Sequence, residues 1–433
     1  MNQLFPRTRR WKQFLGSLAV ALGTCVPATG QEVQPNVPPV EAPAQATNSF
    51  KLDLDAAVQH ALANQPTLRA ARAGQGAAVA SRQAADSALA IFSGPQIKYR
   101  RQQATLGVQI ADANMRQVEL ETVNAVTRSY LGVLYAREQL QIAEKTVSQL
   151  TVVRDAAMNS EHISKLDVER LNAYLDLGKS RIEEARMGID RAKAALREAI
   201  GLPCQTPIEI GSEPLKKFYE DYSRFKNARG ANLSVPNAVA AAVNNRAEIS
   251  QATLAAQVHC LEVEAQGVIF HPYARTFAAL SDIHGKILPA SIIDGDYRPG
   301  PVGPEMPVYL AGSTSDRVLR AQQFYDRALA VVDKARGLIS LEVEEGCARL
   351  LGNAEQIALL ENASAKISKV YESAERTYRA DPSQANLNQL LQIQLLEAQT
   401  RAQLNDAYYK FGQALASLQR ATVGHIWDCF VVK

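Results

Sequence analysis

Aromatic residues are scarce in this chain, and long apolar runs are nearly absent from it. Only 6% of its 433 residues are aromatic, and long stretches contain neither proline nor glycine. Few aromatic residues and abundant alanine are atypical of a thick globular core and typical of long, slender helices. No stretch beyond residue 30 approaches the roughly 18 uninterrupted apolar residues of a membrane span. We therefore expect no helix of the mature protein to cross a bilayer.

Concentrated charge of one sign is also missing. The formal net charge is +3, with acidic and basic residues interleaved, which gives no basic face for nucleic acid. The cysteines have no CxxC spacing and are too scattered for a metal cluster. They are Cys25, Cys204, Cys260, Cys347 and Cys429. A disulfide framework is not expected in so large and helical a chain, although individual pairs stay open.

No arrangement typical of an enzyme or a cofactor site is found. The six histidines are dispersed, and the chain has no Gly-rich phosphate loop, no GxSxG elbow and no zinc-ligand spacing. His259 and Cys260 on an expected helix indicate packing, and Asp294-Gly-Asp296 indicates a solvated turn in place of a calcium site. We therefore expect no enzyme, no cofactor and no metal.

The amino terminus has the features of an export signal. A basic segment, 7–12, precedes an apolar run, 14–26, and small residues at 28–30 precede an expected cleavage ahead of Gln31. Cys25, after Leu22-Gly-Thr, also resembles the acylated cysteine of a bacterial lipoprotein, although the threonine departs from that pattern. We predict a signal peptide at 1–30, with lipidation of Cys25 as the open alternative, and a flexible, proline-rich leader at 31–50.

One helical pattern is present twice in the chain. Residues 52–64 align with 233–245 at a constant offset of 181, so that Asp53 and Ser234 share an N-cap position. Further along, apolar residues spaced by sevens align at an offset of 217: Val126, Val133 and Leu140 with Val343, Leu350 and Ile357. We predict a first helical repeat at 51–202, a connector at 203–232 and a second repeat at 233–424.

Each repeat is expected to contain three long helices. In the first repeat they lie at about 55–90, 96–159 and 166–200, and Gly201 caps the third. In the second repeat they lie at about 236–269 and 315–379 and, after a turn at 381–383, up to about 422. The predicted fold is mainly α, an elongated bundle of antiparallel, coiled-coil-like helices. A short irregular or β insert is expected at 271–313, and a tail at 425–433. Alanine-rich seams bury little area per residue, so we expect self-association.

The order of these segments resembles the TolC-like outer-membrane efflux family. The segment 54–68, Leu-Asp-Ala-Ala-Val-Gln-His-Ala-Leu-Ala-Asn-Gln-Pro-Thr-Leu, is similar to the family's opening, and 126–143 resembles its long helix. Ser164-Lys-Leu-Asp-Val168 and Gly201-Leu-Pro203 are similar to its turn and return helix. The resemblance implies a homotrimer in the outer membrane, with a periplasmic helical tunnel joined to a β-barrel. It also implies two partners, a periplasmic adaptor protein and an inner-membrane transporter.

One departure from the family concerns the strands. Family members have two strands between the first and second helices of each repeat, and a membrane strand needs about 9 to 11 residues. The interval 89–101 holds at most a turn, so the first hairpin is expected to be missing. Short strands are expected at 274–281, 286–293 and 306–311, interrupted by Pro289 and the run 298–304. Half the strands would leave a narrow or incomplete barrel, so pore formation stays open.

The turns between the second and third helices of the repeats are the candidate site for partner docking. The resemblance implies that these tips meet the adaptor, whereas the alternative is simple helix capping. The candidate residues are Asn159, Ser160, Glu161, His162, Ser164 and Asp167 in the first tip and Arg379, Asp381, Pro382 and Ser383 in the second.

Two functions of different classes are compatible with these features. The first is an exported outer-membrane efflux or secretion conduit that faces the periplasm. The second is a periplasmic scaffold of the same descent, which keeps the helices and lacks a pore. The number of strands in the assembled protein distinguishes the two, and an enzyme would instead require a pocket with converging ionisable groups.

Overall fold

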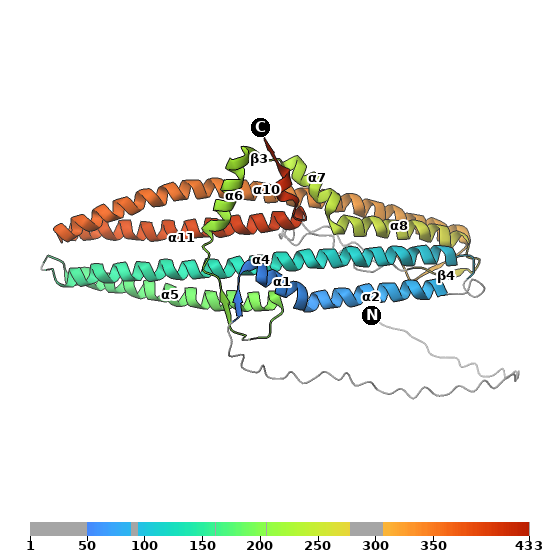
Figure 1. Ribbon diagram of the computed structural model, residues 1–433, viewed down its shortest axis with the longest axis horizontal. Coiled ribbons are helices and arrows are strands. Elements are labelled where there is room, and N and C mark those ends of the chain that lie inside the picture. The colour runs from blue at the N-terminus through green and yellow to red at the C-terminus, as the bar shows by residue number, and fades with distance from the viewer. Residues whose placement is uncertain (1–49, 88–93, 161, 205, 278–305, 433) are drawn as a thin grey trace, which may run out of the picture. The chain divides into compact units, whose positions relative to one another are not determined.

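The computed structural model describes residues 50–87, 94–160, 162–204, 206–277 and 306–432. The described chain is mainly α, and its long helices run side by side in antiparallel pairs (Figure 1). The predicted fold class is therefore confirmed. Both sets of helices belong to one compact unit, residues 45–433. Within the described ranges, no helix combines the length and the apolar character that a membrane span requires.

The first set of helices contains a break that was not expected from the sequence. It consists of α1 (Leu54–Asn64), α2 (Pro66–Ser87), α4 (Ile97–Met158) and α5 (Lys165–Ile200). The single helix expected at 55–90 is thus two helices, and this expectation was wrong. Gln65 has an extended backbone, with φ −61° and ψ 125°, because Pro66 disfavours the helical conformation of the residue before it.

The second set repeats this arrangement. It consists of α7 (Val235–Asn245), α8 (Ala247–Gly267), α10 (Thr314–Ala380) and α11 (Gln384–Ala421). The helix expected at 236–269 is again broken, at Arg246, whose ψ is 133°. No proline follows Arg246, so the break has a tertiary cause: the buried Arg246 guanidinium binds the carboxylates of Glu248 and Glu342.

Three short strand pairs fasten the ends of these helices. β1 (Phe50–Leu52) pairs in parallel with β2 (Ile208–Ile210), and β3 (Ala231–Leu233) pairs antiparallel with β6 (Phe430–Val432). β4 (Tyr273–Arg275) pairs antiparallel with β5 (Tyr309–Ala311) within the insert. Of the expected strands, 274–281 and 306–311 correspond to the three-residue β4 and β5, and 286–293 lies outside the described residues. The β1–β2 pair therefore joins the segments before and after the first set of helices, and the β3–β6 pair joins the segments before and after the second set.

The core lies along the seam between α4, α10 and α11. Val126 and Val133 of α4 are buried there, as are Val343, Leu350 and Ile357 of α10. These residues have the seven-residue spacing that keeps an apolar stripe directed at neighbouring helices. The sequence pattern therefore identified most of this seam correctly, although Leu140 is only half-buried.

The connector adds an aromatic cluster at the middle of the bundle. α6 (Lys216–Arg229) crosses the helices (Figure 1), and its Tyr222 packs edge-on against Phe411 of α11, with ring centroids 5.1 Å apart. Phe225 packs against Trp427 of the 3-10 helix η2 (His425–Cys429) at 4.7 Å. The connector thereby packs α6 against α11 and the end of the chain.

Gly346 of α10 tests how closely α10 and α11 pack. A Cβ atom at Gly346 would lie 2.9 Å from Cδ2 of the buried Leu418. We predict that Gly346→Ala lowers the free energy of unfolding by about 1–3 kcal/mol, because overpacking outweighs the gain in helix propensity. Thermal unfolding followed by circular dichroism measures the effect.

Gly352, less than two turns further along α10, provides the control. An added Cβ atom meets nothing within 4 Å there. Gly352→Ala should therefore raise stability by up to about 1 kcal/mol. Equal stabilisation by both substitutions would contradict the packing described for Gly346.

Candidate partner-binding sites at the two ends of the bundle

The two turns between the long helices lie together at one end of the bundle. Figure 1 shows the α4–α5 turn beside the α10–α11 turn. The hydroxyl of Ser160 donates a hydrogen bond to the backbone oxygen of Pro382 at 3.3 Å, which joins the first turn to the second. The structure therefore brings both predicted tips into one surface.

The first tip is organised by capping interactions. Asn159 ends α4, and its side-chain amide donates to the backbone oxygen of Asp155 at 2.9 Å. Ser164 is the N-cap of α5 and accepts from the backbone N–H of Asp167 at 3.2 Å. The backbone N–H of the exposed His162 donates to the hydroxyl of Ser160 at 3.3 Å. Glu161, also a candidate, lies outside the described residues.

The second tip is shorter and also capped. Asp381 ends α10, and its side chain accepts a hydrogen bond from the Asn386 amide at 3.1 Å. Ser383 is the N-cap of α11 and accepts from the backbone N–H of Asn386. The exposed Arg379 pairs with Glu375 at 2.6 Å. Pro382 is half-buried between the two caps.

Asp167 differs from the other candidates because its side chain is buried, with only 4% of its surface exposed. It accepts hydrogen bonds from the Ser164 hydroxyl at 2.6 Å and from the Gln384 amide at 2.9 Å, and it pairs with Arg170 at 3.1 Å. These interactions bind α5 to the start of α11. Asp167 therefore stabilises the tip, and its carboxylate is not accessible to a partner protein.

The surface of the tip is apolar as well as polar. Met158 and Leu166 flank the first turn with 62% and 79% of their surface exposed. Beneath them a separate core cluster includes Leu171, Tyr378 and Leu387. The two exposed residues were not predicted from the sequence, although apolar side chains beside a polar turn were a visible signal. An exposed apolar patch rimmed by polar groups is the chemistry of a protein-docking surface.

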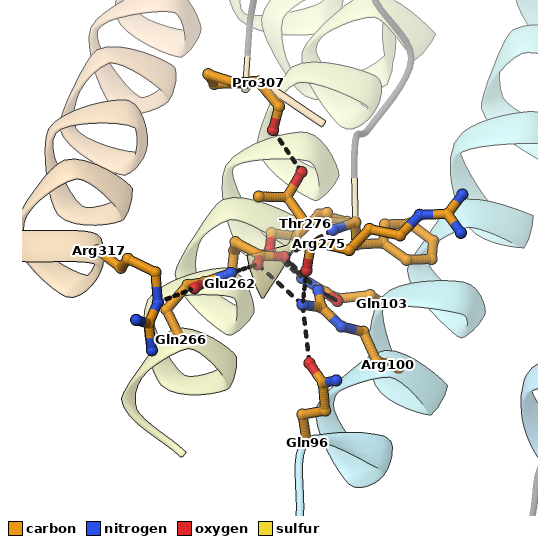
Figure 2. A network of polar contacts seen from close by, with 11 residues as sticks. Gln96, Arg100, Gln103, Glu262, Gln266, Arg275, Thr276, Pro307 and Arg317 are labelled. Carbon is orange, nitrogen blue, oxygen red and sulfur yellow. Dashed lines mark hydrogen bonds and ion pairs between the residues drawn. The ribbon is translucent and has the colours of Figure 1, made fainter. Parts of the chain in front are cut away.

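The opposite end holds a buried polar network at the base of the insert (Figure 2). Its centre is Glu262 of α8, which is fully buried. The Glu262 carboxylate pairs with the guanidinium of Arg100 and accepts from the side-chain amides of Gln103 at 3.0 Å and Gln266 at 2.7 Å. It also accepts from the backbone N–H of Phe277 at 3.0 Å, just beyond β4.

The network extends to the start of α10 through a second cation, which is fully buried. Arg317, which has no exposed surface, donates to the Gln266 side chain at 3.1 Å and to the backbone oxygen of Gly312 at 2.7 Å. The Thr276 hydroxyl donates to the backbone oxygen of Pro307 at 2.6 Å (Figure 2). The two described strands of the insert, β4 and β5, are therefore fixed to α4, α8 and α10.

The ionisation of Glu262 follows from these partners. Burial alone would raise the pKa of its carboxyl group, but the Arg100 guanidinium and the donors from Gln266 and Phe277 outweigh burial. The pKa of Glu262 therefore lies below its ordinary value, and the carboxylate is charged at neutral pH. This network was not predicted from the sequence, although charged residues on otherwise apolar helix faces were its signal.

Among the residues that the structure describes, thiols and metal ligands are not gathered at either end of the bundle. Cys204 and Cys260 are exposed, Cys347 and Cys429 are buried, and all four are free; burial chiefly raises the pKa of Cys347 to about 11. Within the described ranges, no three His, Cys, Asp or Glu residues are placed to hold a metal ion. Cys25, the candidate for lipidation, lies outside those ranges.

The fold is that of solved outer-membrane channels, in agreement with the TolC-like architecture expected from the sequence. The chain superimposes on the outer-membrane channel OprN with a TM-score of 0.62 and 14% identity, covering 86% of this chain and 90% of that one. The open state of the MtrE outer-membrane channel of Neisseria gonorrhoeae gives 0.65 and 14%, covering 86% and 89%. CusC, whose structures describe transmembrane channel formation, gives 0.63 and 17%, covering 88% and 96%. No family model and no curated protein matches the chain.

Glu262 provides a direct test of the network at the base of the insert. We predict that Glu262→Ala lowers the free energy of unfolding by about 3–5 kcal/mol, because it leaves the Arg100 guanidinium, whose side chain is only 16% exposed, without its counter-ion. A folded-state pKa below the ordinary value means that this contribution is present above about pH 4.5 and is lost as the pH falls through the lowered pKa. Thermal unfolding of native and variant protein between pH 7 and pH 3 measures it.

Glu264, two residues further along α8, is exposed and serves as the matched control. Glu264→Ala should change stability by less than about 0.5 kcal/mol at every pH. A stability difference between native protein and Glu262→Ala that stays constant down to pH 3 would contradict the role given to the Glu262 carboxylate.

Proposed function

We propose that this chain is the outer-membrane component of an efflux or secretion conduit. In this proposal three copies form a helical tunnel that faces the periplasm and meets a periplasmic adaptor protein and an inner-membrane transporter. The observation that carries the proposal is the fold, which is shared along nearly nine-tenths of the chain with outer-membrane channels. At 14–17% sequence identity, this similarity supports a shared architecture and does not specify the exported compound.

The exposed apolar surface supports assembly with other copies. Large apolar side chains are exposed along the flanks of the long helices, where no described element of the chain covers them. They include Val152, Leu177, Met187, Leu341, Leu359, Val370 and Leu396. Apolar residues repeated along a helix flank favour self-association, since soluble monomers seldom leave such stripes uncovered.

One observation favours the alternative, a periplasmic scaffold without a pore. Only residues 88–96, nine positions, separate α2 from α4, whereas residues 268–313, 46 positions, separate α8 from α10. Two membrane strands of about 9 to 11 residues each do not fit into the shorter interval. The scaffold would keep the helices and the tips, and it would lack a passage through the membrane.

Fractionation of the cell envelope and the native mass test the proposal together. We expect the chain in the outer-membrane fraction and, in mild detergent, a particle with about three times the mass of one exported chain, which has 47.1 kDa before the expected signal peptide is removed. Multi-angle light scattering gives the mass independently of shape. A single chain that is freely soluble in the periplasm would overturn the conduit. A trimer that leaves the membrane with high salt would favour the scaffold.

The tip provides a further prediction, in which Leu166→Asp weakens docking without unfolding α5. Leu166 is 79% exposed and lies in the first turn of α5, where a carboxylate favours the helix N-terminus. Cross-linking through the amine of the neighbouring Lys165, exposed in the same turn, should capture a periplasmic protein. We expect the variant to lower its yield about tenfold, the loss that an exposed apolar anchor of roughly 1.4 kcal/mol gives.

Ala173→Asp is the control for the added charge. Ala173 is exposed on α5, about two turns from the tip. This variant should retain the cross-linked product, which mass spectrometry identifies. Equal yields from Leu166→Asp and native protein would remove the tip from the proposed docking surface.

A further inference from the structure

The two buried thiols of the described chain lie in the same part of the core. Cys347 is in the middle of α10 and has none of its surface exposed, and Cys429 ends η2 with 2% exposed. Both belong to the apolar cluster along the seam of α4, α10 and α11. The other two described cysteines, Cys204 and Cys260, are exposed and lie outside this cluster. Two of the four described thiols are therefore enclosed together, away from solvent.

The duplication indicates which part of the chain faces Cys347. The offset of 217 aligns Cys347 with Tyr130 of α4. Tyr130 is buried and reaches the β1–β2 pair: a Cβ atom at Gly211, directly after β2, would lie 3.5 Å from its hydroxyl oxygen. Gly211 stands at the end of the pair from which α1 starts, because its N–H donates to the backbone oxygen of Leu52 at 3.1 Å. In the first half, this position of the long helix therefore contacts the strand pair.

Cys429 occupies the corresponding place at the β3–β6 pair. It directly precedes β6, and its backbone oxygen accepts from the N–H of Ser234 at 2.9 Å, at the end of the pair from which α7 starts. The electrostatics agree with this placement, since the pKa of the Cys347 thiol is raised to about 11, first by burial and then by the charge of Cys429. Each half thus places one residue of its long helix against a strand pair, and in the second half both partners are thiols.

A strained turn brings Cys429 to this position. Val423 has a φ of 54° and Gly424 a φ of 83°, and a β-branched residue rarely adopts a positive φ. The turn reverses the chain after α11, so that η2 packs on α7 and α11. Such strain persists only where the surrounding structure holds it, and here Ile426 and Cys429 are buried in the core. A covalent bond to α10 would hold this strained segment in place.

We propose that a disulfide bond joins Cys347 to Cys429 in the exported protein and fastens the β3–β6 pair to α10. The oxidant is an external disulfide, either oxidised glutathione or the disulfide of a thiol oxidoreductase. One sulfur–sulfur bond forms in the protein, that of the oxidant breaks, and the two thiol protons pass to the two sulfurs of the oxidant. The inference rests on export to an oxidising compartment, which the conduit and the scaffold share, and it does not depend on a pore or on the number of copies.

Burial also determines when the bond forms. The structure shows the reduced state, with both thiols free. The attacking species in thiol–disulfide exchange is the thiolate, and burial raises the pKa of Cys429 as well as that of Cys347. The Cys429 thiol also donates to the backbone oxygen of His425 at 3.2 Å, which favours the protonated form. Oxidation therefore takes place while the end of the chain is still open, before η2 packs on the core.

Peptide mapping of the exported chain tests the bond. Cells are lysed in N-ethylmaleimide, which blocks free thiols, and the purified protein is denatured and digested with trypsin without reductant. We expect the peptide 337–349, which contains Cys347, to be linked to the peptide 421–433, which contains Cys429. Cys204 and Cys260 should both be blocked, and reduction should release the two linked peptides. Blocking of all four described cysteines, or a link from Cys347 or Cys429 to glutathione or to another cysteine, would overturn the proposal.

Single substitutions are the matched controls. Reactive thiols of the denatured, unreduced protein are counted with dithiobis(nitrobenzoate), and the bond leaves two of the four described thiols reactive. Cys347→Ala frees the thiol of Cys429, so the count should rise from two to three, and Cys429→Ala should do the same. Cys204→Ala removes an exposed thiol, so the count should fall to one and the linked peptide should remain. Without the bond the native protein would give a count of four, and every one of these substitutions would lower it.

The outcomes separate this inference from the proposed function. An outer-membrane particle of three copies in which Cys347 and Cys429 are both blocked by N-ethylmaleimide would overturn the bond and leave the conduit standing. A linked peptide from a single chain that is freely soluble in the periplasm would support the bond and overturn the conduit.

Discussion

The structure depends on a narrow apolar seam that long helices share with their neighbours. α4 has 62 residues and α10 has 67, so each runs for roughly 90–100 Å at 1.5 Å per residue. Twelve of their 29 buried residues are alanine or valine, whose small side chains give little burial per residue. No long helix is stable by itself under these conditions, and each must lie against others over its whole length. The antiparallel pairs and the crossing connector follow from this requirement.

Buried charge fixes how the helices are positioned along the seam, because an apolar stripe of repeating spacing permits sliding. At the break between α7 and α8, Arg246 pairs with Glu248 and Glu342, and Glu342 also pairs with Arg420 of α11. At the equivalent break in the first set, Gln65 donates to the backbone oxygens of Glu198 and Ala199 in α5. The same position thus uses a neutral amide in one half and an ionic network in the other. Removing a single member of such a network costs more than the intact network contributes, because the remaining partners stay buried and uncompensated.

Local signals in the sequence predicted the long helices well. The expected limits 96–159 and 166–200 differ by one residue at most from α4 and α5, because Ser164 and Gly201 act on their own helix ends through capping. The break at Arg246 could not be predicted in this way, since its cause is Glu342, 96 positions away. Pro66 was a local signal for the corresponding break, and its effect was underestimated.

In the candidate sites, too, local features could be predicted from the sequence and long-range contacts could not. The tip residues were found because turns and caps are local, whereas the burial of Asp167 depends on Gln384, 217 positions away. Arg100 and Glu262 are separated by 162 positions, and the sequence alone contains no indication that they meet. An apolar repeat predicts which face of a helix is buried, but it does not predict which distant charge a buried carboxylate will bind.

Divergence between the two halves is concentrated at one end of the bundle. Helices α1 and α7 begin 181 residues apart and α4 and α10 begin 217 residues apart, so the helical parts have kept their lengths closely. The interval before the long helix differs, with nine residues in the first half and 46 in the second. A conduit and a scaffold would share the helices and the tips and differ in this interval. The network around Glu262 anchors the described ends of the longer interval, at Phe277 and Gly312, to three helices. A loosely attached surface loop would need no such anchor, because loops tolerate insertion without buried ion pairs. The difference between the two functions therefore resides at the insert end, where the repeats no longer match.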